Sequence, residues 1–396
     1  MRLLGLAQTD PTVPITGSGA AAKYLFDAVA RRHELVHRAG VDLTRPQRAL
    51  LAAATFRPSR KDWQMRFYWN WNLALNLRSF NSRRVIRRLE EPVDVVLQVF
   101  GLFHTHGAPF ALYVDNTAEL SRRHWPAWVA VEGRALERLY AWERRLYRDA
   151  LHVFSQGTPA ARSVVSFYGV PEDRVSVVGG GANFDVLPER TGAQRDPVVL
   201  YVGADWARKG GDVLIRAFRK VRARNRHARL QIVGTSEPAP EPGVEVLGFV
   251  SDRGRLSELY AKASVYCLPS RYEPYGLSIA EAMAHELPCV VTRVGGLADV
   301  VLDGQTGLVV PPEDEDALAD ALLRLLDDPV YARRLGTNAR SRVETHQNWD
   351  AVVERMTPVL ERFGAPSSGL RRPSRFQRGA AVETPEPARR GPYPDD

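Results

Sequence analysis

The chain has 396 residues, of which 44% are hydrophobic and 25% charged, so it has the composition of a globular protein with two or three domains. Its formal net charge of +8 permits an anionic partner without requiring one. Cys267 and Cys289 both lie in apolar runs, which argues against a disulfide framework or a cysteine metal site. No stretch has the pattern of a signal peptide or a membrane span. We therefore expect a cytoplasmic protein, with peripheral contact to the inner membrane face as an open alternative.

Apolar strands alternate with amphipathic helices along most of the chain, which is typical of parallel sheets covered on both faces. In the first half we expect helices at 21–32, within 62–88 and at 134–150, and strands at 93–101, 109–117 and 151–158. In the second half we expect strands at 196–205, 228–236, 264–270 and 288–294, and helices at 211–225, 252–263, 278–286 and 315–328. The Gly- and Pro-rich segment 179–197 separates the halves and predicts a linker.

Two glutamates with seven residues between them stand in the stretch "SRYEPYGLSIAEAMAHELPCVVTRVGG". Glu273 precedes a proline and is predicted to lie in a loop, whereas Glu281 lies about one turn inside the following helix. The amides of Gly276 and Leu277, at the start of that helix, are suited to a diphosphate. A carboxylate one turn in can accept hydrogen bonds from both ribose hydroxyls, and a loop carboxylate can bind those of a sugar. The stretch therefore predicts a nucleotide-sugar site beyond the carboxyl ends of the strands.

The same residues resemble the donor signature of retaining glycosyltransferases of family 4, which have the GT-B fold. The resemblance comprises Glu273, Glu281, the strand "PCVVT" with its Gly-Gly loop, and the segments 202–218 and 303–326. It implies an α/β protein of two Rossmann-like domains facing each other across a cleft. It also implies transfer of a sugar from a UDP- or GDP-linked donor to a glycan, glycolipid or polysaccharide, without a metal or other cofactor. We expect no nucleic-acid partner, because no recognition motif accompanies the positive charge.

The resemblance implies domain limits as well. Residues 1–185 would bind the acceptor, residues 186–345 would bind the nucleotide sugar, and residues 346–363 would form a helix that returns to the first domain. Residues 364–396 contain many prolines and show no apolar periodicity, so we expect a disordered tail.

Individual roles follow from the resemblance. Lys209 would neutralise the diphosphate with the help of Arg208, Glu273 would bind the donor sugar, and Glu281 would bind ribose. Gly17 and Gly19 would form a glycine loop before the first helix, facing the diphosphate.

The first domain of the family often has a histidine beside the donor sugar. Here the matching position is Asp115, next to Asn116, and we expect Asp115 to take part in catalysis. His104 and His106 are further candidates for this cleft, with an ordinary role as polar loop residues left open.

The implied mechanism has no protein nucleophile. The acceptor attacks from the face that the nucleotide leaves, and the departing phosphate takes the acceptor's proton, so the protein positions the reactants and stabilises charge.

Three positions depart from the family pattern: Ala204 replaces a frequent arginine, Asp115 replaces the histidine, and Ala298-Asp299 replaces proline-glutamate. These departures keep open an alternative in which the chain is a catalytically silent scaffold of the same fold. The Arg- and aromatic-rich stretch 57–88 leaves a second choice open. It forms either a helix with Trp63, Phe67, Trp71 and Leu75 packed inward or a surface for an anionic membrane.

Overall fold

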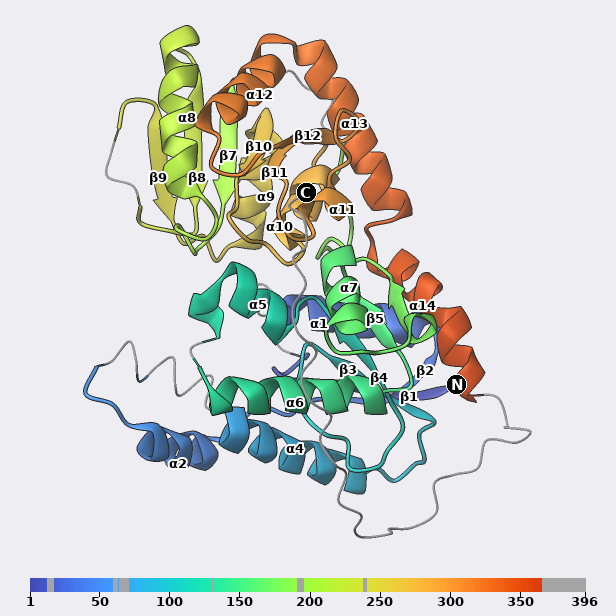
Figure 1. Cartoon of the computed structure of the whole chain (residues 1–396). Helices are drawn as coiled ribbons and strands as arrows, with labels where there is room; N and C mark the ends of the chain where they lie inside the picture. The colour runs from blue at the N-terminus through green and yellow to red at the C-terminus, as the bar shows by residue number, and fades with distance from the viewer. Residues whose placement is uncertain are drawn as a thin grey trace. The chain divides into compact units, whose positions relative to one another are not determined.

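Two parallel β-sheets, one in each half of the described chain, form the framework of the protein (Figure 1). The computed structural model describes residues 1–12, 18–59, 63, 71–129, 131–190, 196–237 and 241–364. Residues 1–364 form one compact unit.

The first sheet has the strand order β2-β1-β3-β4-β5-β6, and every pair of neighbours is parallel. Its strands are β1 Arg2–Ala7, β2 Glu34–Gly40, β3 Val95–Val99, β4 Phe110–Val114, β5 Val153–Ser155 and β6 Val175–Val177. The chain therefore reverses its direction of travel across the sheet between β1 and β3, because β2 lies on one side of β1 and all later strands lie on the other.

The second sheet has the strand order β12-β11-β10-β7-β8-β9 and is also fully parallel. Its strands are β7 Val198–Val202, β8 Arg229–Val233, β9 Val244–Gly248, β10 Val265–Leu268, β11 Cys289–Thr292 and β12 Gly307–Val310. Here the reversal falls between β7 and β10.

Helices cover the two sheets, and two of them, α8 and α12, lie side by side (Figure 1). The described helices of the first half are α1 Ser18–Arg32, α2 Arg45–Thr55, α4 Trp71–Arg87, α5 Ala118–His124, α6 Arg134–Asp149 and α7 Thr158–Ser166, with short 3₁₀ turns at Pro126–Trp128 and Glu172–Arg174. Those of the second half are α8 Gly211–Arg224, α9 Arg253–Lys262, α10 Leu277–Ala284, α11 Leu297–Val300, α12 Glu315–Asp327, α13 Pro329–Thr345 and α14 Trp349–Gly364. No described helix combines the length and the apolar character needed to cross a membrane.

The apolar side chains that set the helical period in the sequence are the ones that face the core. In α8, Val213, Leu214, Ala217, Phe218 and Val221 are all buried, as their spacing predicts. Strands β3, β4, β10 and β11 are buried along their whole length, because helices cover both faces of a parallel sheet. Hydrophobic burial of this kind is the main favourable contribution to folding.

Residues 2–7 differ most from the sequence-based expectation. The sequence pattern predicts no regular element there, yet the stretch forms β1, which pairs with β2 and β3 inside the first sheet. Leu3, Leu4 and Leu6 are completely buried there. A six-residue apolar run is too short to show by periodicity alone which element it forms.

Helix α14 packs beside α1, and its apolar residues share a core with Leu3 and Phe26 of the first half. The domain limits at 185 and 345 stay predictions. The proposed helix within 62–88 is present from Trp71 onward as α4, while Phe67 and the predicted tail at 365–396 lie outside the described residues. Contact of 57–88 with a membrane therefore also stays a prediction.

Candidate functional site

The two glutamates and the lysine singled out in the sequence come together at the reversal point of the second sheet. Lys209 lies in the loop after β7 and Glu273 in the loop after β10, and β7 and β10 are neighbours. In open parallel sheets, ligands bind outside the carboxyl ends of the strands at such a reversal point. The two loops therefore meet where a ligand is expected.

Glu273 is a buried carboxylate held by two cations. Its Oε2 atom lies 3.4 Å from Lys209 Nζ and 3.1 Å from Arg208 Nη1, and the residue is only 8% exposed. Burial by itself would raise the pKa of Glu273, but the charges of Lys209 and Arg208 outweigh it and hold the pKa below its ordinary value. Glu273 is thus an ionised hydrogen-bond acceptor next to a lysine.

Arg208 acts mainly as a support for this carboxylate. Its guanidinium donates to Asp205, to Glu273 and to the carbonyl of Tyr272, and it lies 4.7 Å from the ring centre of Trp128. Because protein groups occupy these donors, the structure links Arg208 to the positioning of Glu273. Its direct contact with a diphosphate stays a prediction.

Two glycines allow the Glu273 loop to pack tightly. A Cβ atom on Gly295 would lie 2.0 Å from the carbonyl oxygen of Glu273, and one on Gly296 would lie 2.3 Å from that of Pro274. The amide of Gly296 also donates to the Glu273 carbonyl at 3.1 Å. The Gly-Gly pair after β11 therefore supports the loop from behind, and any side chain there would displace it.

Helix α10 begins directly after this loop, as the sequence predicts. Gly276 precedes it with φ of 93°, Leu277 is its first residue, and Glu281 lies one turn inside. Leu277 packs against the hydrophobic cores of both halves.

Glu281 is also a buried carboxyl group, and its partner is an arginine. The Nη1 atom of Arg253 lies 3.4 Å from Glu281 Oε1, and the Arg253 side chain is 48% exposed. Burial raises the pKa of Glu281, and the charge of Arg253 opposes that rise. The guanidinium also donates to the carbonyl of Asn183 and lies 5.7 Å from the ring centre of Phe184, so Arg253 is anchored beside Glu281.

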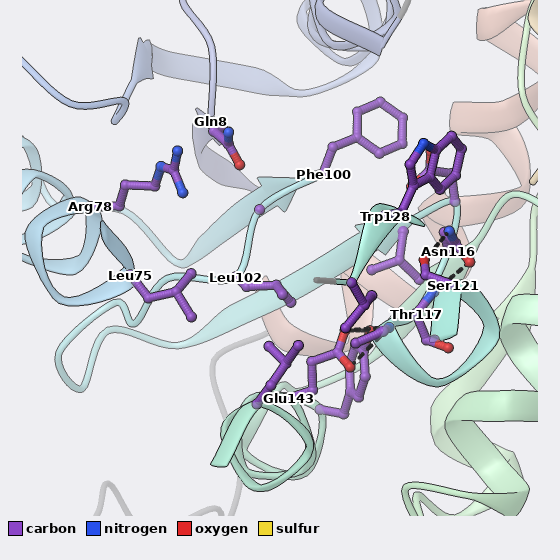
Figure 2. Close-up of a pocket in the computed structure, with 17 residues that line it drawn as sticks. Gln8, Leu75, Arg78, Phe100, Leu102, Asn116, Thr117, Ser121, Trp128 and Glu143 are labelled. Carbon is purple, nitrogen blue, oxygen red and sulfur yellow. Dashed lines mark hydrogen bonds between the residues drawn. The ribbon is translucent and has the colours of Figure 1, made fainter. Parts of the chain in front are cut away.

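The first half contributes a cavity of about 400 Å³ at the reversal point of its own sheet (Figure 2). Gln8 follows β1, Phe100 follows β3, and Asp115 follows β4, so three strand ends open into it. Figure 2 shows Leu75 and Arg78 on one side, Asn116 and Trp128 on the opposite side, and Glu143 on a third.

Asp115 connects this cavity to the glutamate site. Asn116, its neighbour, accepts a hydrogen bond of 2.6 Å from the hydroxyl of Tyr272, the residue before Glu273. Burial raises the pKa of Asp115 to about 6, and the negative charge of Glu273 adds to the rise. The sequence-predicted Asp115 therefore lies close enough to Glu273 to sense its charge.

Glu143 is a cavity residue that sequence reasoning missed. It accepts hydrogen bonds from the hydroxyls of Tyr147 and Tyr168 and from the amide of Ala118, at the start of α5. Burial raises its pKa to about 7 in spite of these bonds. In the sequence it is one of several charged residues in a strongly amphipathic helix, so nothing marked it as buried.

The other candidates in the first half lie elsewhere. The ring of His104 packs at a tilt against Trp142, and His106 hydrogen-bonds the carbonyl of Ser79. Neither histidine is among the residues that line the cavity. The sequence places Gly19 before the first helix, but the structure has it in the first turn of α1, which begins at Ser18. Gly17 lies outside the described residues.

The sequence does not predict two hydrogen-bonded contacts that join the two halves. The carboxylate of Asp299 accepts hydrogen bonds of 2.7 Å from the amide and 2.9 Å from the hydroxyl of Thr158, at the start of α7. The hydroxyl of Tyr275 accepts from the amide of Gly180 and donates to its carbonyl. Asp299 is one of the three departures from the family pattern, and here it caps a helix of the other half.

Known proteins resemble both the sequence and the fold. Residues 196–328 match the family model described as glycosyl transferases group 1. The chain is 30% identical over 260 residues to an MMP alpha-(1->4)-mannosyltransferase of Mycolicibacterium hassiacum, covering 63% of this chain and 62% of the relative. It is also 30% identical to a D-inositol 3-phosphate glycosyltransferase of Nocardia farcinica, covering 62% and 59%. The matches thus span about three fifths of the length of these relatives.

Solved structures share the whole arrangement of two sheets. A sucrose-phosphate synthase of Thermosynechococcus elongatus superposes with a TM-score of 0.68 at 21% identity, covering 93% of this chain and 100% of the other. HepE of Anabaena, in complex with UDP-glucose, gives a TM-score of 0.63 at 17% identity, covering 91% and 100%. At this level of identity the likeness shows the fold, and the predicted GT-B class with two parallel α/β sheets is confirmed.

Proposed function

We propose that the chain is a retaining glycosyltransferase, because residues 196–328 match the family model described as glycosyl transferases group 1. It takes a sugar from a nucleotide-diphosphate donor and places it on the hydroxyl of a glycan, glycolipid or polysaccharide. The observation that carries the proposal is the ion pair of 3.4 Å between Lys209 and Glu273, beside the start of α10. The HepE structure with bound UDP-glucose supports UDP as the nucleotide.

Each group at the site suits one part of such a donor. The start of α10 and the ammonium of Lys209 offer positive charge to the diphosphate, as helix N-termini do in other proteins. Glu281, one turn further, accepts hydrogen bonds from ribose. Glu273 accepts hydrogen bonds from the transferred sugar, and its lowered pKa keeps it ionised for that purpose.

The reaction forms a bond between the acceptor oxygen and the anomeric carbon and breaks the bond from that carbon to the phosphate oxygen. The proton of the acceptor hydroxyl passes to the departing phosphate. Lys209 stabilises the negative charge that develops on this phosphate. Such electrostatic stabilisation of the transition state is usually the largest single contribution to catalysis. Asp115 faces the donor sugar from the first half and orients the acceptor hydroxyl.

Donor binding is tested first, by thermal shift of the full chain against UDP-glucose, GDP-mannose and related nucleotide sugars. A ligand that binds the folded state raises the melting temperature by mass action. We expect one donor to raise it and to be hydrolysed slowly without an acceptor. Lys209→Ala should lower that hydrolysis at least about 100-fold.

Lys262→Ala serves as the matched control, because Lys262 is an exposed lysine at the end of α9. It should behave as wild type. Absence of any donor-dependent shift and hydrolysis, or equal hydrolysis by Lys209→Ala and wild type, would contradict the proposal.

A further inference from the structure

The cavity of the first half is placed to hold the acceptor if the chain has the function proposed above. It lies where the chain direction reverses in the first sheet, which is the usual ligand position in such folds. Asn116 on its wall bonds to Tyr272, which is adjacent to Glu273 in sequence. A molecule in this cavity therefore lies next to the carboxylate proposed to hold the donor sugar.

Most of the cavity wall is apolar. Leu75, Val129 and Leu139 form a small hydrophobic cluster of their own, against which Leu102 packs (Figure 2). The volume of about 400 Å³ lies in the lower part of the range for small-molecule pockets, roughly 300–1,000 Å³. Such a chamber fits a compact body rather than an extended chain of sugars.

The polar side chains on the wall already have protein partners. Arg78 pairs with Asp42, Thr117 with Ser163, Asn116 with Ser121 and Tyr272, and Glu143 with two tyrosines. A sugar ring inserted here would bury hydroxyls that find few open partners. Each unpaired hydroxyl would weaken binding, because a buried polar group without a partner loses its hydrogen bonds to water.

Gln8 and Asp115 differ from these residues because, within the described part of the chain, neither bonds to another side chain. The Asp115 carboxylate accepts from its own backbone amide and from that of Asn116, which leaves it further acceptor capacity. Both residues follow strand ends at the open side of the sheet. An amide and a carboxylate can together hold one hydroxyl. Asp115 is also the cavity residue whose charge is coupled to that of Glu273.

We infer that the cavity receives the apolar ring system of a hydrophobic alcohol, whose hydroxyl lies between Gln8 and Asp115 and points to the donor sugar. The alcohol oxygen bonds to the anomeric carbon, the bond from that carbon to the phosphate breaks, and the hydroxyl proton leaves with the phosphate. A small aglycone held by Leu75, Leu102 and Leu139 thus replaces the glycan, glycolipid or polysaccharide acceptor of the proposed function, while the donor and the reaction stay as proposed.

The probe is umbelliferone, an aromatic alcohol, with maltose as the polar comparison. Binding of each to the full chain is measured by calorimetry, and transfer is measured with the donor found above. Leu139→Trp and Leu102→Trp fill the cavity from two different elements. Leu50→Trp makes the same change on α2, where the leucine is 57% exposed.

We expect umbelliferone to bind to and be glycosylated by the wild type and by Leu50→Trp. Both cavity variants should bind it at least tenfold more weakly while they retain donor binding and slow donor hydrolysis. That retention shows that they are folded.

Transfer to maltose and not to umbelliferone, or equal umbelliferone binding by wild type and both cavity variants, would overturn the inference and leave the proposed function standing. A wild-type chain that binds no nucleotide sugar would instead overturn the proposed function, and the acceptor role with it.

Discussion

The two halves of the molecule differ in the partners of their buried carboxyl groups. In the second half, Glu273 has two cations within 3.4 Å, and Glu281 has an arginine at the same distance. In the first half, Asp115 and Glu143 have no cation partner among the described residues, and burial raises their pKa values to about 6 and about 7. Two cations therefore favour the charged form of Glu273, whereas burial favours the neutral form of Asp115 and Glu143. Glu281 is intermediate, because burial raises its pKa and the charge of Arg253 opposes that rise.

This difference matches two kinds of ligand. A paired carboxylate beside a lysine suits a charged, hydroxyl-rich donor, since the pair persists when the ligand arrives. A cavity with few unpaired charges suits an uncharged ligand, because such a ligand can be buried without a partner of opposite charge. Changing one carboxyl group at a time tests whether the two halves differ in this way.

The largest effect is expected from Glu273→Ala. The change removes a proposed sugar ligand and leaves Lys209 and Arg208 without their shared partner. Sugar transfer should fall at least about 100-fold, as measured by the rate of product formation at saturating donor. Glu258→Ala, at an exposed position on α9, should leave the rate unchanged. Wild-type turnover by Glu273→Ala would show that the ionised carboxylate of Glu273 does not contribute to sugar transfer.

Glu143→Gln should alter the dependence of stability on pH. The folded pKa of about 7 lies above the ordinary value of 4.5, so the folded state holds the proton that the unfolded state has lost. The wild type should therefore lose stability as pH rises through this window, by up to roughly 3 kcal/mol. Glutamine cannot ionise and should abolish the loss.

The check on Glu143 is urea unfolding of both proteins at several pH values from about 4.5 to 8. The gap in unfolding free energy should move in favour of Glu143→Gln as the pH rises. If the unfolding free energies of the two proteins changed with pH in parallel, Glu143 would ionise in the folded protein as readily as in water. Burial would then not raise its pKa, and Glu143 would not differ from an exposed carboxyl group.

The smallest effect is expected from Asp299→Ala, which removes the cap on α7 across the two halves. Loss of the two bonds to Thr158 should lower the free energy of unfolding by about 0.5–2 kcal/mol. Chemical denaturation measures the change. Asp320→Ala, an exposed residue on α12, is the control and should change stability by less than about 0.5 kcal/mol. An Asp299→Ala protein no less stable than this control would show that the contact between halves does not contribute.

The sequence by itself determined strands β7, β8, β10 and β11 of the second half and the loop that carries Glu273. Glu273, Gly276, Leu277 and Glu281 follow one another within a loop and a helix, so their relative places depend only on a proline, a glycine and the helical period. The alternation of strands and helices gave the parallel sheets for the same local reason. Short apolar runs such as residues 2–7 were not predicted as strands, because their pattern fits a strand or a helix equally well.

Only the tertiary structure decided which distant groups meet. Lys209 and Glu273 are 64 residues apart, and Asp299 and Thr158 are 141 apart. The cavity combines strand ends and helices from separate parts of the chain, and Glu143 becomes a buried acid because two tyrosines and a helix start surround it. Local spacing carries no information about such contacts, since they arise from the order in which strands join a sheet and from the packing of the two halves.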